Sequence, residues 1–246
     1  MSVHASTSEK LLSLRRLLAA SNGIAASNRQ PQRTVISAAG GGESQSGPLW
    51  DLAPRTIQEW VATTEGSGAQ ELALCNARLS LRYQSVDAGG RWLVVDADLS
   101  PVALAERGVD LSRVVSVRAP EPNDLLWTVE QGLRSRGVDL VICRVDRLPP
   151  VAFRRWKLAA EVGGTRCIVL RGIEALRESG WADLRVQVTP LCSTGWDTRR
   201  MRVETLKVRN GLPGEVIEVE LDRETDRLRV VSVLADPAAA PCAAGA

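Results

Sequence analysis

Histidine is almost absent from this chain, whose 246 residues include only His4. A serine or cysteine nucleophile that needs a histidine base therefore lacks its partner, and zinc sites lack one of their usual ligands. The five cysteines are too few and too scattered for a disulfide framework, and none forms a Cys-x-x-Cys pair. We therefore expect no triad hydrolysis, no bound metal and no other cofactor.

The chain also lacks a strong net charge and a long apolar run. Its 31 Lys and Arg against 29 Asp and Glu leave a formal net charge of +2, so any binding to nucleic acid must come from a local basic patch. No apolar stretch approaches the roughly 18 residues of a membrane span, and the N-terminus lacks the apolar core of a signal peptide. We expect a soluble cytoplasmic protein without membrane contact.

The composition predicts three regions. Within residues 1–47, the stretch 9–20 places Leu11, Leu14 and Leu18 at the spacing of an amphipathic helix, and 21–47 reads as a flexible linker. That helix could dock on its own domain or on a neighbouring subunit or partner. Residues 48–234 carry the folded domain. Residues 235–246, rich in alanine and proline, are predicted to be disordered.

The folded region changes its pattern part-way along. From residue 91 to 172, short apolar runs alternate with helical stretches, which predicts a mostly parallel sheet with helices on both faces. From residue 183 to 233, strands alternate apolar and polar residues and are joined by turns, which indicates antiparallel pairing. The predicted fold class is therefore α/β, a parallel sheet continued by antiparallel strands.

The stretch TTEGSGAQELAL, residues 63–74, resembles a phosphate-binding loop that lacks its chemistry. When the pattern G-x-x-x-x-G-K-[ST] is set with its second glycine at Gly68, its lysine falls on Ala69 and its magnesium-binding hydroxyl on Gln70. The degenerate loop comprises Gly66, Ser67, Gly68, Ala69 and Gln70. The glycines still predict a turn from a strand into a helix.

A second nucleotide element would be an aspartate at the end of an interior strand. The run DLVICRVD, residues 139–146, has Arg144 at that position, and an arginine there opposes a magnesium ion. Both defects remove electrostatic stabilisation on which phosphoryl transfer depends. We therefore expect a protein that is not an enzyme.

The order of segments resembles the bacterial RecA recombinase family. Residues 94–150 match that family in the order and spacing of strands and helices, and ADLRVQVT with RRMRVETLKVRNGLPGEVIEVELD resembles its late antiparallel strands. The eroded nucleotide site, with RRWKLAAE (154–161) and CIVLR, is similar to the ImuA proteins of the inducible mutagenesis cassette. That resemblance implies a role in SOS-induced translesion DNA synthesis, with RecA, an ImuB-type Y-family polymerase homologue and, indirectly, an error-prone replicative-type polymerase as partners.

Basic residues gather in two places that are either solvated faces or binding surfaces for DNA or a partner. The loop tryptophan Trp196 could stack on a base or fill a partner pocket. The candidate residues are Arg144, Arg147, Arg154, Arg155 and Lys157 in the first group and Trp196, Arg199 and Arg200 in the second.

Two other functions stay open on the sequence. One is an ATP-dependent DNA recombinase with an unorthodox nucleotide site, in which Asp98 serves as the base and an arginine replaces the missing cation. The other is an SOS cell-division inhibitor that targets a polymerising GTPase, because folds of this kind serve many functions.

Overall fold

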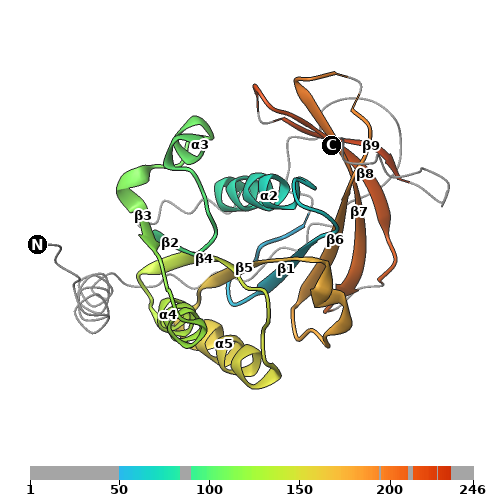
Figure 1. Cartoon of the computed structure of the whole chain (residues 1–246). Coiled ribbons are helices and arrows are strands. Elements are labelled where there is room, and N and C mark those ends of the chain that lie inside the picture. Colours follow the sequence, from blue (N-terminus) through green and yellow to red (C-terminus); the bar gives the residue numbers. More distant parts are fainter. Residues whose placement is uncertain (1–49, 84–89, 194, 210–212, 226, 234–246) are drawn as a thin grey trace, which may run out of the picture.

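The structure is a computed structural model that describes residues 50–83, 90–193, 195–209, 213–225 and 227–233 (Figure 1). The predicted helix over 9–20, the linker over 21–47 and the tail over 235–246 lie outside these residues. What the structure describes is the folded domain expected from residue 48 onward.

One mixed sheet organises the domain, with strand order β3-β2-β4-β5-β1-β6-β7-β8-β9. Neighbouring strands from β3 to β6 run parallel, and β6 to β9 pair antiparallel. The strands are β1 (Ile57–Ala62), β2 (Arg91–Val95), β3 (Val114–Val117), β4 (Val138–Arg144), β5 (Arg166–Arg171), β6 (Leu184–Pro190), β7 (Thr198–Val208), β8 (Val216–Asp222) and β9 (Leu228–Val233). The predicted fold class, a parallel sheet continued by antiparallel strands, is confirmed.

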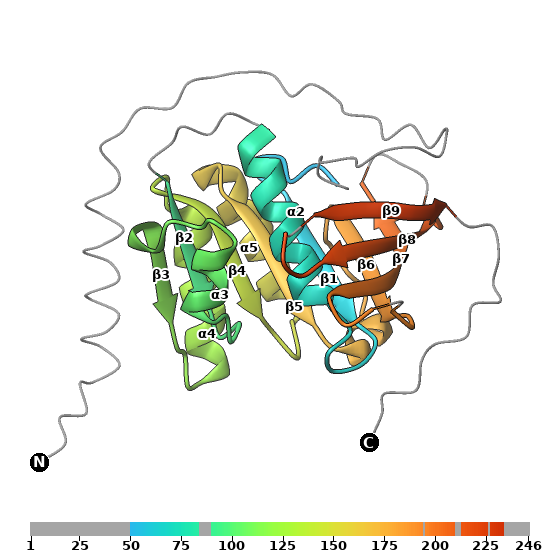
Figure 2. The same ribbon diagram turned by 90° about the horizontal axis from the view of Figure 1, so that it is seen from above.

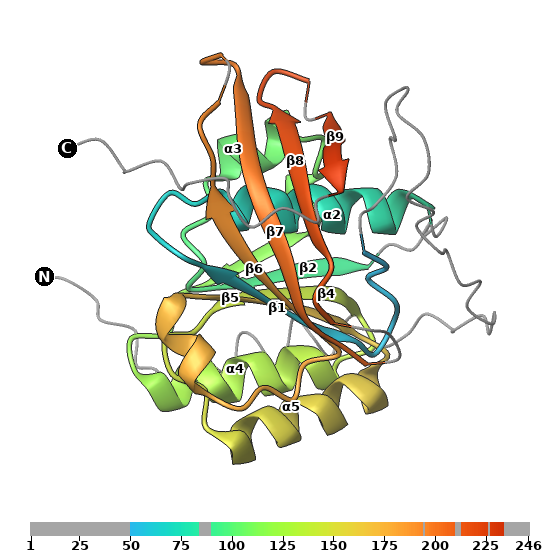
Figure 3. The same ribbon diagram turned by 90° about the vertical axis from the view of Figure 1, so that its right-hand side faces the viewer.

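Helices cover both faces of the parallel strands, as the apolar runs predicted. Figures 1 and 3 show α2 and α3 on one face and α4 and α5 on the other. The helices are α2 (Ala69–Tyr83), α3 (Pro101–Glu106), α4 (Pro122–Arg134) and α5 (Pro150–Gly163), with short 3-10 turns η1 (Leu111–Arg113) and η2 (Ile173–Arg177). Proline at the first turn of α3, α4 and α5 fits a position whose N–H has no partner within the helix.

The central strand β1 separates two apolar cores because its successive side chains point to opposite faces. Trp60 packs with α2, and its ring meets Trp50 edge-on at a centroid distance of 5.3 Å. Ile57 packs on the other side with α4 and α5, where buried Trp156 donates from Nε1 to the carbonyl oxygen of Leu126 at 3.0 Å. Strand β1 therefore holds both cores together.

The antiparallel strands extend the sheet past β1 on the side away from β2 and β3 (Figure 2). Along β7, Met201 and Val203 are buried in the same core as α2, whereas the alternate residues Arg200 and Arg202 are half-buried. This alternation brings one face of β7 against the start of α2. Consequently, residues of β7 contact the loop between β1 and α2.

Candidate functional site

The loop between β1 and α2 lies at the carboxyl edge of the parallel strands, where ligands of open α/β sheets usually bind. Thr63 anchors its start, donating from both its backbone N–H and its Oγ1 to the carbonyl oxygen of Val188, each at 3.1 Å. Gly66 and Gly68 have φ values of 69° and 87°, a region that glycine enters without a side-chain penalty. The strand, glycine turn and helix thus occur where the sequence placed them.

Two amides of this loop are already used by the loop itself. The N–H of Ser67 donates to the carbonyl oxygen of Thr64 at 3.2 Å, and the N–H of Ala69 donates to the buried Oγ of Ser67 at 3.3 Å. A working phosphate loop directs successive backbone N–H groups at the anion instead. An anion that used these two amides would displace internal hydrogen bonds, and it would meet alanine in place of lysine.

The two residues that replace the expected magnesium ligands bind each other. Arg144, at the carboxyl end of β4, donates from Nη2 to Oε1 of Gln70 at 2.6 Å, although 74 positions separate them. Both side chains are half-buried, and Arg144 Nε is buried with no hydrogen-bond partner among the described residues. The two positions that the sequence analysis compared with magnesium ligands therefore hold a guanidinium and a neutral amide that bind each other.

Strand β7 closes the loop from a second side. A Cβ at position 68 would collide with Sδ of Met201 and would lie 2.9 Å from Cδ of Arg199. Both side chains therefore pack directly against the loop backbone at Gly68 and leave no room for a side chain there. Arg199 also brings Nη1 to 3.0 Å from Oε2 of Glu71, in a geometry that makes an ion pair without a hydrogen bond. We call Gln70, Glu71, Arg144 and Arg199 the loop latch.

Asp98, considered above as a catalytic base, follows β2, the strand that pairs with β4, at whose end Arg144 lies. The side chain of Asp98 is 74% exposed and lies 3.7 Å from Nη2 of Arg118. The structure therefore gives this carboxylate neither the burial nor the neighbours of a poised general base.

The structure divides the first basic group among different environments. Arg144 belongs to the loop latch. Arg155 reaches from α5 to α4, where its Nη2 lies 2.6 Å from Oε2 of Glu130, and Lys157 binds Asp183 and the carbonyl oxygen of Arg55. Arg147, Arg154 and Arg155 are exposed, and Arg155 is paired with Glu130. Arg147 follows β4 and Arg154 lies in the first turns of α5, so we keep these two as candidate binding residues near the carboxyl edge of β4.

The second group is divided in the same way. Arg199 belongs to the loop latch, and Arg200 crosses to β8, where its Nη2 lies 2.6 Å from Oε2 of Glu218. Trp196, in the connection between β6 and β7, has 84% of its surface exposed. Strand β6 lies three strand spacings from β4, or about 14 Å, at the same sheet edge. Arg147, Arg154 and Trp196 therefore form the edge surface, a candidate binding face.

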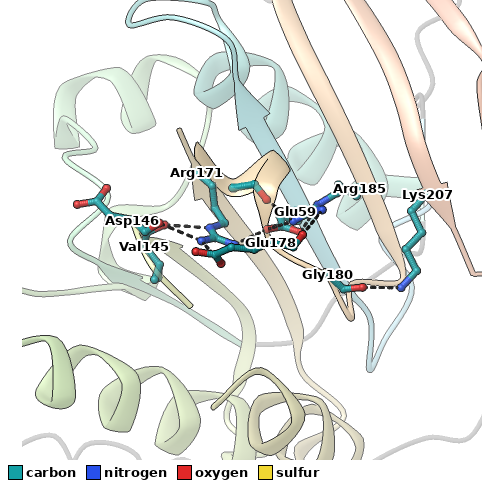
Figure 4. Close-up of polar contacts among 9 residues, drawn as sticks. Glu59, Val145, Asp146, Arg171, Glu178, Gly180, Arg185 and Lys207 are labelled. Carbon is teal, nitrogen blue, oxygen red and sulfur yellow. Dashed lines mark hydrogen bonds and ion pairs between the residues drawn. The ribbon is translucent and has the colours of Figure 1, made fainter. Parts of the chain in front are cut away.

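A buried charge cluster was missed by the sequence reasoning (Figure 4). Oε1 of the fully buried Glu59 accepts from Nη1 of Arg171 at 2.8 Å, and its Oε2 accepts from Nε of Arg185 at 2.7 Å. A glutamate inside the apolar run IQEWVA and an arginine closing CIVLR were the signals available. A charged residue in a buried strand needs a partner of opposite charge. The glutamate therefore predicts a buried cation near it, and the arginine predicts a buried anion.

Each guanidinium nitrogen of Arg171 and Arg185 donates at least one hydrogen bond. Arg171 donates to the carbonyl oxygens of Val145 and Asp146 and to Glu178, and Arg185 donates to the carbonyl oxygens of Ala175 and Glu178. Gly180 closes the cluster, since a Cβ there would lie 3.0 Å from both Arg185 and Glu59. We call Glu59, Arg171, Glu178 and Arg185 the buried network, and its geometry is that of a structural element.

Within the described ranges, no three His, Cys, Asp or Glu side chains are grouped so that they could hold a metal ion. None of the helices in this part of the chain is long and apolar enough to cross a membrane. No protein-family model matches the chain, and no curated protein resembles it at a significant level.

Proposed function

We propose that this protein is a non-catalytic, RecA-like accessory factor of SOS-induced, error-prone translesion DNA synthesis. It acts by binding RecA and an ImuB-type polymerase homologue, with DNA as a further candidate ligand. The sequence resemblance over residues 94–150 and the α/β sheet with its late antiparallel strands support the proposal.

The hydrogen bond between Arg144 and Gln70 is the observation that carries the non-catalytic part of this proposal. It joins the two positions at which a nucleotide enzyme would hold magnesium, and Ala69 supplies no positive charge for the phosphates. Met201 and Arg199 press on the same loop. Binding of a nucleotide would therefore break internal contacts, and neither a lysine nor a bound magnesium ion would stabilise the phosphates.

Calorimetry with magnesium and ATP tests this part. We expect no measurable heat of binding and no phosphate release, with or without single-stranded DNA. Tight ATP binding with turnover would contradict the proposal, and turnover abolished by Asp98→Asn would establish the recombinase alternative.

The edge surface supports the binding part. Arginine and tryptophan are enriched where interfaces gain most of their affinity, and Arg147, Arg154 and Trp196 leave their polar or aromatic groups exposed. A base could stack on Trp196 while the arginines contact phosphates. The same side chains could enter an acidic or apolar pocket of a protein partner.

A double charge reversal, Arg147→Glu with Arg154→Glu, should weaken binding to purified RecA, the polymerase homologue or single-stranded DNA at least about tenfold. Arg113→Glu is the control, because Arg113 is exposed, pairs with Asp110 and directly precedes β3, at the opposite edge of the sheet. In cells, the double variant should lower damage-induced mutation frequency. Unchanged affinity for all three ligands would remove the edge surface, and filamentous growth on expression would favour the division inhibitor.

A further inference from the structure

A second exposed tryptophan lies at the opposite end of β6 from the edge surface. Trp181 precedes β6 and has 55% of its surface exposed, whereas Trp196 follows this strand. Seven residues at about 3.3 Å each place the two ends of β6 roughly 23 Å apart. Trp181 therefore belongs to a separate surface, at the amino edge of the parallel strands.

Hydrogen bonds fix the backbone on both sides of this indole. The carbonyl oxygen of Gly180 accepts from Nζ of Lys207 at 2.8 Å (Figure 4). The buried carboxylate of Asp183 accepts from the backbone N–H of Ile57 at 2.8 Å, and the N–H of Asp183 donates to the carbonyl oxygen of Ile57 at 2.9 Å. Ala182 is buried in the core that contains α4 and α5. An exposed ring on a fixed backbone is preorganised, so binding to it orders few further groups.

Basic residues flank Trp181 from the strands on either side of β6. Nζ of Lys157 donates both to the carbonyl oxygen of Arg55 and to Oδ2 of Asp183, which places the exposed Arg55, just before β1, beside Asp183. On the β7 side, Arg209 donates from its backbone N–H to the carbonyl oxygen of Asp183 at 2.7 Å and from Nη1 to Oδ1 at 2.9 Å. Since β6 lies between β1 and β7, the two arginines are two strand spacings apart, or about 10 Å.

Positive charge exceeds negative charge around the ring. The carboxylate of Asp183 already accepts from Lys157 and Arg209, and the side chain of Arg209 is still 60% exposed. An excess of positive charge beside an exposed aromatic face favours a ligand that carries both anionic groups and flat rings. We call Arg55, Trp181, Lys207 and Arg209 the amino-edge platform.

We propose that the amino-edge platform binds single-stranded nucleic acid, with a base stacked on Trp181 and phosphates at Arg55 and Arg209. Every base has a flat face for the indole, and successive phosphates reach cations on both sides of it, so the contact does not depend on base sequence. A carboxylate-rich protein segment supplies the charges but no repeated flat face. This inference concerns a surface other than the edge surface and does not depend on the proposed function.

Fluorescence anisotropy of labelled oligo-dT and oligo-rU of about 20 nucleotides, titrated with the full chain, tests the proposal. Binding of either oligomer supports it, and the tighter one distinguishes DNA from RNA as the source. Trp181→Ala should weaken binding about tenfold, whereas Trp181→Phe, which keeps an aromatic ring, should stay within about threefold of the unaltered chain.

The salt dependence of the same titrations tests the phosphate contacts. Arg55→Gln should lower the slope of log K against log salt by about 0.7, the value for one phosphate of a single strand. Arg118→Gln is the control and should leave the slope unchanged, because the Arg118 side chain is 89% exposed and follows β3, at the far edge of the sheet.

Tryptophan fluorescence separates this platform from the edge surface. In a Trp196→Phe background, the oligomers should quench the emission, and the further change Trp181→Phe should remove most of that quench. The quench should persist when Arg147→Glu and Arg154→Glu are added to the Trp196→Phe background, whatever they do to RecA binding.

Three results would overturn the proposal. The first is no binding of either oligomer at about 100 µM of the unaltered chain. The second is equal salt slopes for the Arg55 and Arg118 variants. The third is weaker binding of purified RecA by Trp181→Ala with unchanged oligomer affinity, which would assign the platform to a protein partner. Thermal melts show whether Trp181→Ala is folded, and Trp181→Phe with the fluorescence quench tests the ring without removing it.

Discussion

The two faces of the sheet carry charge clusters of similar composition that differ in burial and in hydrogen bonding. On the α4 and α5 side, two guanidinium groups of the buried network surround Glu59, and both oxygens of that carboxylate accept hydrogen bonds from them. On the α2 side, the loop latch is half-buried, and Arg144 Nε has no hydrogen-bond partner among the described residues. Burial and completeness of hydrogen bonding distinguish them.

This difference indicates on which cluster the stability of the fold depends more. A fully desolvated ion cluster is tolerated only when every charge is paired, and losing one partner is then costly. In the half-exposed loop latch each contact contributes less to the free energy of unfolding, so the loss of one contact destabilises the domain less. We therefore expect the domain to depend on Glu59 far more than on Arg144.

The largest effect should follow Glu59→Gln. The change leaves two buried guanidinium groups without their shared anion, and we expect the free energy of unfolding to fall by about 3–5 kcal/mol in urea titrations. Glu174→Gln, in the exposed pair with Arg177, is the control and should change it by less than about 0.5 kcal/mol. A small effect at Glu59 would mean that the network is dispensable.

An intermediate effect should follow Gly68→Ala. The residue has φ of 87°, and the new Cβ would collide with Met201 and Arg199, so we expect a loss of about 1–3 kcal/mol. Gly172→Ala is the control, because a Cβ there meets nothing within 4 Å and φ is −79°. Thermal unfolding of both variants measures the difference, and equal melting temperatures would show that β7 does not press on the loop in solution.

A smaller effect should follow Arg144→Leu. Loss of one hydrogen bond from a half-buried side chain should cost about 1 kcal/mol, since water can replace part of the contact. A double-mutant cycle with Gln70→Ala should give a coupling energy of similar size. Arg147→Leu serves as the exposed control, and zero coupling would contradict the latch.

The smallest effect concerns two of the three buried thiols among the described residues, Cys75 on the α2 face of the sheet and Cys167 on the α4 and α5 face. Burial raises the pKa of the Cys167 thiol, so alkylation of the native protein requires local opening at any pH near neutrality. If the latch side opens more readily, Cys75 in α2 should react about threefold faster than Cys167 in β5. Mass spectrometry of timed labelling measures both rates, and identical rates would show that both faces open as one unit.

The fold class was predictable because its signals are local and repeated. Continuous apolar runs indicated the parallel strands, which are buried on both faces. Alternation of apolar and polar residues indicated β6 to β9, which have one face toward solvent. The turn at Gly66 and Gly68 was predictable for the same reason, as it depends on backbone angles within a few residues. The grouping of basic residues was not, because neighbours in sequence such as Arg154, Arg155 and Lys157 point to different sides of one helix.

The sequence by itself determined the absence of a lysine at Ala69 and of an acid at Arg144, because the residue type alone excludes each role. Only the tertiary structure decided what replaced them. Two contacts join positions that are far apart in the chain: the hydrogen bond from Arg144 to Gln70 and the packing of Met201 against Gly68. Both arise from the order of strands in the sheet. The chemistry of a side chain can be read from the residue type alone, whereas contacts across a sheet form only when the fold places the strands side by side.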